Sequence, residues 1–529
     1  MKIYDTTLRD GTQSPDLNLS VREKIEFTLA LDKLGVDYIE LGWPGSNTKD
    51  MEAFNEISKY KLDHAKICAF GATRKKGVRA EEDPNLNAIL KSKASVATLF
   101  GKTWLVHVEK QLGMKPEENL DIIYESVKFL KDKNLEVVYD AEHFFDGFKD
   151  NKDYALQCLS KAYEAGADCL VLCDTNGGCF PWEIKNIVNE VKEYLRKNDL
   201  KIKIGIHCHN DRDLAVPNSL LVVKDVDQIQ GTINGFGERT GNTDLCSIMP
   251  ALVNMQINFN AEKNLKKLTA LSRLLFTLGN IRPYTRQPYV GKNAFSHKGG
   301  IHVDAVSKGA SYEFMNPEDV GNQRETILSD LSGKANIVEM VKKFGYEIDK
   351  NDKRIAKMLI KVKGMEKEGY DINGVEAEQY LLTKQFFNNA GEFIKIEFFD
   401  VRSIGRKSTR STCFMKAAIE NEMIEYESKV SGGPVDALYC ALQNMLKKVY
   451  PDINKLKLEN YKVRIAEQKG VSSSVRVYVE FSFNKNRNKQ EWATVGVNDN
   501  ILTASLEAVK KGFEYYFMKI EKKTGAIHD

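Results

Sequence analysis

Two closely spaced histidines give the first indication of chemistry in this sequence. The stretch "IHCHND" contains His207 and His209, and on a β-strand a spacing of two residues sends both imidazoles to the same side. Cys208, between them, then points the other way. Asp10, in "TLRDGTQ", and Asn242, in "GERTGN", offer a carboxylate and an amide oxygen. If the four groups meet, they form a mixed nitrogen and oxygen ligand set suited to a divalent ion such as Mn, Mg, Zn or Co. A satisfied core or surface pair is the commoner explanation of His-x-His alone.

A second group of polar residues could bind and activate a substrate. Arg9 is placed to polarise a carbonyl oxygen, and Thr175, in "CDTNGG", offers a hydroxyl to a substrate carboxylate. Asp140 and Glu142, in "YDAEHF", fall on the same side of a strand, where mutual repulsion can raise the pKa of one of them toward neutrality. Asp140 could equally serve only to anchor a loop. Lys102, in "LFGKTW", is either a second cation at this site or a plain surface lysine.

These motifs need a scaffold that brings them together, and the first half of the chain predicts one. Short apolar runs alternate with amphipathic stretches up to about residue 245. The expected strands are Lys2–Thr6, Tyr38–Leu41, Lys66–Phe70, Val96–Phe100, Glu136–Tyr139, Cys169–Cys173, Lys203–His207 and Gln228–Thr232. The expected helices are Ser20–Leu34, Asp50–Tyr60, Pro84–Lys91, Pro116–Lys131, Asn151–Ala165, Pro181–Leu195 and Asp213–Val223. The first of these helices carries a capping-box signature, Ser20 with Glu23, and ends before Gly35.

Eight strands alternating with helices over about 250 residues predict an α/β fold, a (β/α)8 TIM barrel. A doubly wound open sheet is the competitor, but the first turn, "RDGTQ", lacks the glycine-rich phosphate fingerprint of that fold. Active sites of TIM barrels lie at the carboxyl ends of the strands, where all the polar motifs above occur. The seventh, eighth and first strands are neighbours in a closed barrel, so the four candidate metal ligands can reach one point.

Length and composition restrict the remaining possibilities. The chain has 529 residues, enough for two to four domains. Its 77 basic and 74 acidic residues give a net charge of +3, which is too small to indicate a protein that binds nucleic acid. No signal-peptide pattern opens the sequence, and no apolar run approaches the ~18–20 residues that span a bilayer. The nine cysteines form no zinc or disulfide framework, so we expect reduced thiols and a cytoplasmic protein.

The second half of the sequence changes character. We expect a catalytic barrel over residues 1–290, a mixed helical connector over 291–375 and a C-terminal α+β domain over 376–529. Within the last of these, "VSGGPVDALYCAL" (430–442) and "VNDNILTASLEAV" (497–509) align without gaps. A strand-to-helix unit that occurs twice predicts a pseudo-symmetric regulatory domain. The starts of its two helices, near Gly432–Gly433 and Asn498–Asn500, could hold a carboxylate through backbone N–H groups.

Several motifs in one order resemble a known family. "TTLRDGTQ", "HCHND", "GFGERTGN", "SHKGGIH" and "GGPVDAL" are similar to those of the metal-dependent acyl-CoA Claisen synthases, which comprise the 2-isopropylmalate, homocitrate and citramalate synthases. Within the family, "ELGWPGSN", "LFGKTW" and "YDAEHFFDGF" look most like the longer type of citramalate synthase. The resemblance implies condensation of acetyl-CoA with pyruvate, to give (R)-citramalate and CoA for isoleucine biosynthesis. The alternative is 3-methyl-2-oxobutanoate as the acceptor, for leucine biosynthesis.

The resemblance also assigns roles to residues. It makes Asp10, His207, His209 and Asn242 the metal ligands, Arg9 and Thr175 contacts for the 2-oxo acid, and Glu142, His302 and Tyr312 catalytic acid–base residues. In this family His302 and Tyr312 act in the other subunit of a homodimer, and His297 is a weaker candidate for either role. The C-terminal domain would be allosteric and bind an amino acid, isoleucine on this interpretation.

Two departures from the family pattern concern loops, and two rival functions remain. "RDLAV" lacks a glycine that many relatives have two residues after the Asp of "HCHND", and "VVKDVDQIQGT" lacks the usual Gly-Ala step. An acyl-CoA lyase would use a similar barrel, but the regulatory C-terminal domain argues against it. A barrel kept only for binding would have lost the metal ligands, which are all present.

Overall fold

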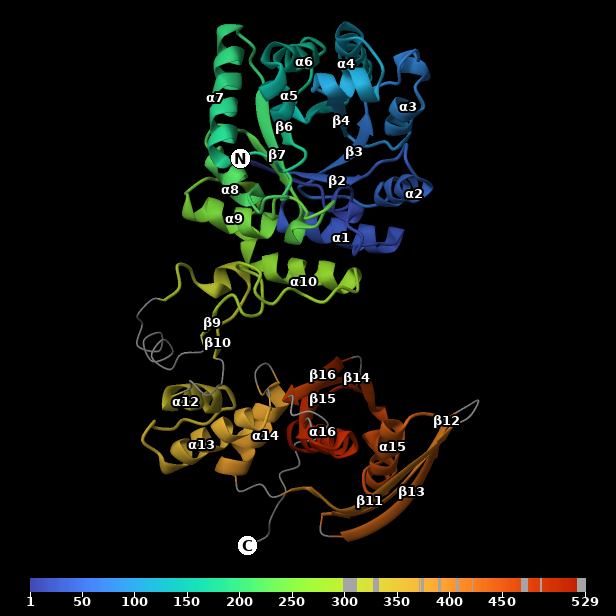
Figure 1. Cartoon of the computed structure of the whole chain (residues 1–529), viewed down its shortest axis with the longest axis vertical. Coiled ribbons are helices and arrows are strands. Elements are labelled where there is room, and N and C mark those ends of the chain that lie inside the picture. The colour runs from blue at the N-terminus through green and yellow to red at the C-terminus, as the bar shows by residue number, and fades with distance from the viewer. Residues whose placement is uncertain are drawn as a thin grey trace. The chain divides into compact units, whose positions relative to one another are not determined.

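The computed structural model describes residues 1–297, 312–326, 333–370, 372, 375–388, 392–405, 409–420, 422–467, 474–485 and 488–520. These residues form two compact units (Figure 1). The first unit comprises Met1–Phe295 with Met315–Arg324, and the second comprises Ser296–Phe314 with Glu325–Asp529. His302, one of the predicted catalytic residues, lies outside the described residues.

The first unit is a closed barrel of parallel strands in the order β1 to β8 (Figure 1). The strands are β1 Lys2–Asp5, β2 Tyr38–Gly42, β3 Lys66–Ala72, β4 Val96–Lys102, β5 Glu136–Glu142, β6 Cys169–Asp174, β7 Lys203–Cys208 and β8 Gln228–Gly231. β8 pairs with both β7 and β1, which closes the barrel. The predicted (β/α)8 fold is therefore confirmed, and the strands that precede the candidate metal ligands are neighbours.

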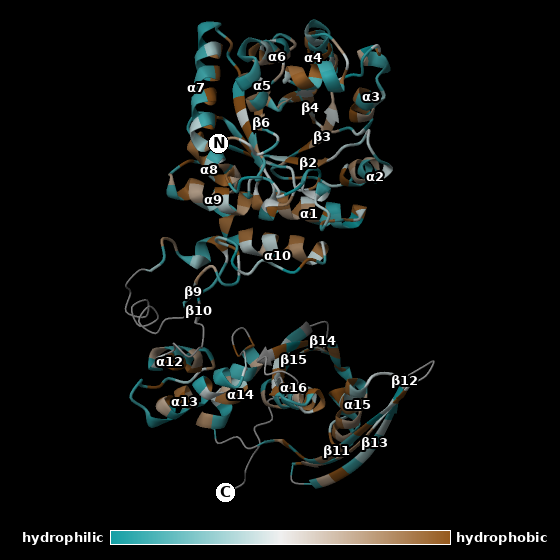
Figure 2. Ribbon diagram, in the orientation of Figure 1, coloured by the Kyte–Doolittle hydropathy of each residue, from teal (hydrophilic) through white to brown (hydrophobic). Residues whose placement is uncertain are grey.

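Helices surround this barrel and bury an apolar layer against its outer face. The expected helices are α1 Val21–Leu34, α2 Thr48–Ile57, α3 Pro84–Lys91, α4 Pro116–Lys131, α6 Lys152–Glu164, α7 Pro181–Lys197 and α8 Ala215–Leu221. Three were not expected: α5 Phe144–Asp150, α9 Leu245–Asn254 and α10 Leu268–Leu278. Figure 2 shows hydrophilic and hydrophobic residues on different sides of helices such as α7, as amphipathic helices on a barrel require. Helix α1 begins with the predicted capping box, Ser20 with Glu23, and ends at Gly35, whose φ of 98° is left-handed.

The second unit begins with helices and continues with two copies of one motif. The helices are α12 Lys334–Lys343, α13 Lys353–Lys367 and α14 Glu376–Phe387, and a pair of two-residue strands, β9 Ser296–His297 and β10 Glu325–Thr326, also belongs to this unit. The first copy consists of β11 Ile394–Gly405, β12 Thr409–Ile419, β13 Glu422–Val430 and α15 Pro434–Lys447. The second consists of β14 Leu456–Glu467, β15 Ser474–Lys485, β16 Asn488–Asn498 and α16 Ile501–Tyr515. Each set of strands is an antiparallel meander followed by a helix, which explains the sequence repeat.

Among the described residues, no helix has the length and apolar character needed to cross a membrane.

Candidate active site

Asp10, His207 and His209 converge at the carboxyl ends of the barrel strands. His207 Nε2 lies 3.3 Å from His209 Nε2. Asp10 Oδ2 lies 3.4 Å from the first of these nitrogens and 3.8 Å from the second. All three side chains are buried, and their ligand atoms lie within 4.8 Å of one another. Cys208 faces the other way, toward Ser219 of α8, as the strand alternation predicts. As the spacing predicted, both imidazoles therefore lie on one side of the strand and Cys208 on the other.

Asn242 lies next to this group along the backbone, and its side chain bears on whether a cation fits. Its backbone pairs with that of His209 in a short antiparallel bridge. The side-chain Asn242 Oδ1 is buried without a hydrogen-bond partner, and so is Asp10 Oδ1. Buried polar oxygens are nearly always hydrogen-bonded, so the unpaired oxygen of Asp10 beside two convergent imidazoles is what a divalent cation would satisfy. Asn242 Oδ1, also unpaired, is on the residue that pairs with His209. The residues present fit the predicted metal.

The protonation states of Asp10 and His209 also suit metal binding. Burial opposes the charge of Asp10, but Arg9 and the two histidines hold the pKa of its carboxyl far below the ordinary value. Burial lowers the pKa of His209 to about 3. At neutral pH the site therefore offers an ionised carboxylate and a neutral imidazole, the forms that bind metals.

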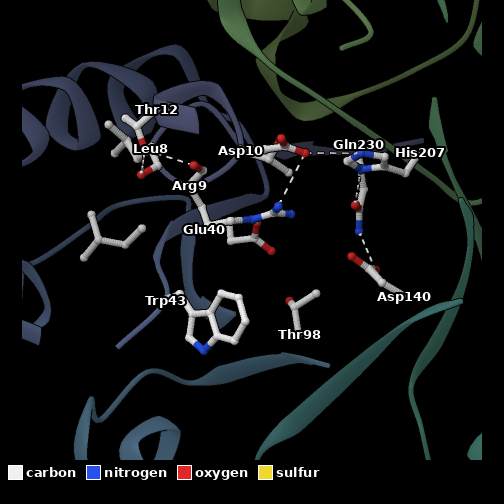
Figure 3. A network of polar contacts seen from close by, with 12 residues as sticks. Leu8, Arg9, Asp10, Thr12, Glu40, Trp43, Thr98, Asp140, His207 and Gln230 are labelled. Atoms are coloured by element: carbon white, nitrogen blue, oxygen red, sulfur yellow. Dashed lines mark hydrogen bonds and ion pairs between the residues drawn. The ribbon is translucent and has the colours of Figure 1, made fainter. Parts of the chain in front are cut away.

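Behind His207, two buried side chains hold the imidazole in place (Figure 3). Gln230, on β8, donates from Nε2 to Asp140 Oδ1 over 3.1 Å. Its Oε1 therefore faces His207 Nδ1, 2.9 Å away, and accepts a hydrogen bond from the N–H there. This arrangement turns His207 Nε2 toward Asp10, the orientation that a metal ligand requires. Burial opposes the charge of His207, but Asp10 raises the pKa of its imidazole, so metal binding would displace a proton from this ring.

The two carboxylates of β5 have different partners, which differs from the sequence-based expectation. The pKa of Asp140 is raised to about 7, first by burial and then by Glu40, so repulsion by Glu142 is not the cause. Glu142 instead pairs with Lys102, whose Nζ lies 2.6 Å from Glu142 Oε2. Lys102 is only 12% exposed, so the interpretation as a plain surface lysine is wrong. Both carboxylates face the same cavity, as their spacing predicted.

Arg9 is held by a carboxylate that the sequence analysis missed. Arg9 Nε lies 2.5 Å from Glu40 Oε1, and Arg9 Nη1 lies 3.4 Å from Asp10 Oδ2. The guanidinium also stacks on Phe70, 3.7 Å from the ring centre. Glu40 is fully buried in β2 and accepts a second hydrogen bond, of 2.7 Å, from Tyr4 Oη. An acidic residue inside the apolar strand "YIELG" was the signal that could have identified it.

A cavity of about 190 Å³ connects these groups. Its polar lining includes the predicted residues Arg9, Asp10, Glu142, Thr175, His207 and His209. Its apolar wall is formed by Trp43, Phe70 and Phe100, whose ring centres lie 5.2 to 5.6 Å apart. A larger cavity, of about 680 Å³, lies at the opposite end of the strands. Ion pairs such as Lys2–Asp37 and Lys66–Glu136 line it, at the amino-terminal end of the strands, whereas TIM-barrel active sites lie at the carboxyl ends.

Thr175 is oriented for donation into the smaller cavity. The backbone N–H of His143 donates to Thr175 Oγ1 over 2.8 Å. Because that bond occupies the hydroxyl oxygen as an acceptor, the hydroxyl proton can be given to a substrate. Arg239 fixes the same residue from behind, since its Nη2 donates to the Thr175 carbonyl over 2.8 Å.

The loop after the histidines keeps a glycine-like geometry without a glycine. Asp213, in "RDLAV", occupies the position where the family resemblance led us to expect glycine, and its φ of 58° lies in the left-handed region. Asp tolerates this region better than most residues, and its side chain is tied to Asn210 Nδ2 over 3.2 Å. The departure noted in the sequence therefore leaves this turn left-handed.

The remaining predicted residues belong to the second unit. Tyr312 is 53% exposed there, and His297 Nε2 lies 2.9 Å from Glu313 Oε1. The catalytic roles of Tyr312 and His302 remain predictions.

Comparisons with known proteins agree with this architecture. The HMGL-like family profile matches residues 1–275, the homocitrate synthase post-HMGL domain-like profile matches 289–369, and the LeuA allosteric (dimerisation) domain profile matches 375–517. The chain is 43% identical to the (R)-citramalate synthase of Geobacter sulfurreducens over 535 residues, covering 99% of each chain. It is 42% identical to the (R)-citramalate synthase of Aquifex aeolicus, covering 98% of each.

The chain belongs to the (R)-citramalate synthase family. It is therefore an enzyme, and the family resemblance seen in the sequence is confirmed. A 2-isopropylmalate synthase of Methanocaldococcus jannaschii is a more distant relative, 31% identical over 98% of this chain and 95% of the relative.

Proposed function

We propose that this enzyme condenses acetyl-CoA with pyruvate and water to give (R)-citramalate and CoA, as a step of isoleucine biosynthesis in the cytoplasm. The observation that carries the proposal is the convergence of Asp10, His207 and His209 with Arg9 and Glu142 around one small cavity. All nine cysteines are free thiols, which suits a reducing compartment.

Asp10, His207, His209 and Asn242 would hold the divalent ion. When bound, that ion supplies Lewis-acid polarisation of the 2-oxo group. The ionised Asp10 and the neutral His209 need no proton release before binding.

The chain's own residues bind the 2-oxo acid and move protons. The guanidinium of Arg9 donates to the keto oxygen, where negative charge develops as the new carbon–carbon bond forms. Thr175 donates its hydroxyl proton to the substrate carboxylate. Glu142 is the cavity carboxylate that we assign to proton transfer, and Lys102 fixes its position. Water then cleaves the thioester and releases CoA. His302 and Tyr312 of a partner subunit complete this acid–base set in our proposal.

The apolar wall favours pyruvate over larger 2-oxo acids. The cavity is small, about 190 Å³, which suits a short 2-oxo acid such as pyruvate. The methyl group of pyruvate would meet the rings of Trp43, Phe70 and Phe100. 3-Methyl-2-oxobutanoate, the acceptor of the alternative reaction, has two more carbons, and the relative named for that reaction is the more distant one.

We propose that residues 1–290 are the catalytic barrel, residues 291–375 a connector and residues 376–529 an allosteric domain that also forms a homodimer. The match to the LeuA allosteric (dimerisation) domain supports this assignment. The effector is an amino acid, isoleucine on our proposal, whose carboxylate would meet the starts of α15 and α16.

The test is a free-thiol assay of the purified enzyme with acetyl-CoA, Mn²⁺ and a panel of 2-oxo acids. We expect the highest kcat/KM with pyruvate, and inhibition by isoleucine. A higher kcat/KM with 3-methyl-2-oxobutanoate would contradict the proposed substrate and favour the 2-isopropylmalate synthase reaction.

A further inference from the structure

Lys24 is a buried cation close to the candidate metal centre that no step of the proposed reaction uses. It lies on α1 and is 1% exposed. Its ammonium donates three hydrogen bonds, to Leu8 O over 2.8 Å, to Leu41 O over 3.0 Å and to Asp50 Oδ1 over 2.6 Å. An ammonium has three donors, so every one is engaged.

Two of these three acceptors, the carbonyl oxygens of Leu8 and Leu41, lie next to residues that line the active-site cavity. Leu8 directly precedes Arg9 and Asp10, which bind the substrate and the metal in the proposed reaction. Leu41 lies in β2, two residues before Trp43 of the apolar wall. One ammonium therefore ties the loop after β1 to the end of β2.

Asp50 extends this connection on α2. Its second oxygen, Oδ2, accepts from the Trp43 backbone N–H over 2.9 Å and from Asn47 Nδ2 over 3.1 Å. Gly42 packs tightly against Asp50, because a methyl group added at Gly42 would come within 2.5 Å of Asp50 Cγ. The ion pair thus fixes the main chain on both sides of the cavity.

Stability alone is a poor explanation of this arrangement. A buried ion pair contributes little net stability compared with apolar side chains of similar volume, because both charges lose their hydration. Apolar side chains could fill the space of Lys24 and Asp50, but they could not bind two carbonyl oxygens and a backbone N–H at once. We infer that Lys24, with Asp50, is a positioning residue that holds the loop of Arg9 and Asp10 in its metal-binding and substrate-binding geometry. This inference rests on the proposed metal-dependent reaction.

The test compares Lys24→Met and Asp50→Asn with a matched control in the second unit. Lys511 is also a largely buried lysine, paired with Glu378 and Glu507 over 3.0 and 2.9 Å and donating to Val495 O over 2.8 Å. Lys511→Met therefore removes a similar ion pair far along the chain from the cavity residues. The dissociation constant of Mn²⁺ is measured on metal-free full-length enzyme by electron paramagnetic resonance, and thermal unfolding is recorded for each variant.

We expect Lys24→Met and Asp50→Asn to weaken Mn²⁺ binding about tenfold or more, the range found when partners behind metal ligands are removed. The single side-chain oxygen in Asp50→Asn can accept from Lys24 or from the N–H of Trp43 but not from both on separate oxygens, so the variant breaks the connection without removing Lys24. The kcat of both variants should fall more than the KM for pyruvate rises, and Lys511→Met should bind Mn²⁺ as the wild type does.

A folded Lys24→Met enzyme that binds Mn²⁺ within threefold of the wild type would overturn the inference. If Lys24→Met does not fold, Asp50→Asn decides by the same criterion. The proposed function fails differently. Wild-type enzyme that binds Mn²⁺ but releases no CoA with any 2-oxo acid contradicts the reaction, while the Mn²⁺ affinities of the variants still decide the role of Lys24.

Discussion

The ring of Phe100 should set the size limit of the acceptor. It lines the cavity and packs against Trp43 and Phe70, with ring centres 5.5 and 5.2 Å away. The isopropyl group of 3-methyl-2-oxobutanoate adds two carbons to the methyl group of pyruvate. At ~30 Å³ each they need ~60 Å³, about a third of the 190 Å³ cavity. Phe100→Ala deletes six ring carbons and opens that room.

The expected effect follows from the free energy of fitting apolar groups. One methylene in a shaped pocket changes the transition-state free energy by ~1–3 kcal/mol. The ratio of kcat/KM for 3-methyl-2-oxobutanoate to that for pyruvate should therefore rise by at least ~10-fold in Phe100→Ala. The assay is thiol release from acetyl-CoA with each acid at saturating metal.

A matched control separates pocket size from a general loss of packing. Phe180 lies in the loop before α7, is 36% exposed and does not line the cavity, so Phe180→Ala should leave the ratio unchanged. If Phe100→Ala stays folded and binds Mn²⁺ but its ratio changes less than threefold, the aromatic wall does not select the acceptor.

Three further predictions concern other parts of the molecule. Arg9→Lys keeps the positive charge but loses the planar guanidinium that meets Glu40. We therefore expect kcat, measured by steady-state thiol release, to fall ~10²–10³-fold. A fall below tenfold would contradict the role of the guanidinium. Gln230→Leu should weaken Mn²⁺ binding ~10–100-fold because His207 loses its orienting partner, and unchanged affinity in a calorimetric titration would exclude that role. Burial raises the pKa of Glu514 to about 7, so the native protein holds this proton longer than the unfolded chain and loses stability as pH rises from about 4.5 to about 7. Glu514→Gln should therefore raise the free energy of unfolding at pH 8 by up to ~3 kcal/mol and change it little at pH 4; an equal effect at both pH values in denaturant titrations would refute the cause.

Local signals in the sequence were sufficient for the barrel and for the convergence of Asp10, His207 and His209. Strand alternation, helix caps such as Ser20 and the spacing of His207 and His209 are encoded within a few residues of one another, and closure of the barrel then brings distant strand ends together. The duplicated strand-to-helix unit was visible for the same reason, because each copy carries its own pattern.

The residues that position the site could not be found from such local signals. Lys24 has the spacing of an ordinary helix lysine, and only the tertiary fold shows that three acceptors surround it. Gln230 was not recognised because its partners lie on other strands. Asp140 and Glu142 were correctly placed on one side of a strand, but the raised pKa of Asp140 depends on its burial and on Glu40 of β2. Glu142 is paired with Lys102 of β4.

The most direct test of the central claim is whether CoA release depends on a metal held by Asp10. Enzyme freed of metal by chelation should release no CoA from acetyl-CoA and pyruvate, and added Mn²⁺ should restore release at about one ion per chain. Asp10→Ala should remain folded, lose this Mn²⁺ binding and stay inactive at any Mn²⁺ concentration tested. Full-rate CoA release by the chelated wild type, or by Asp10→Ala, would contradict the account.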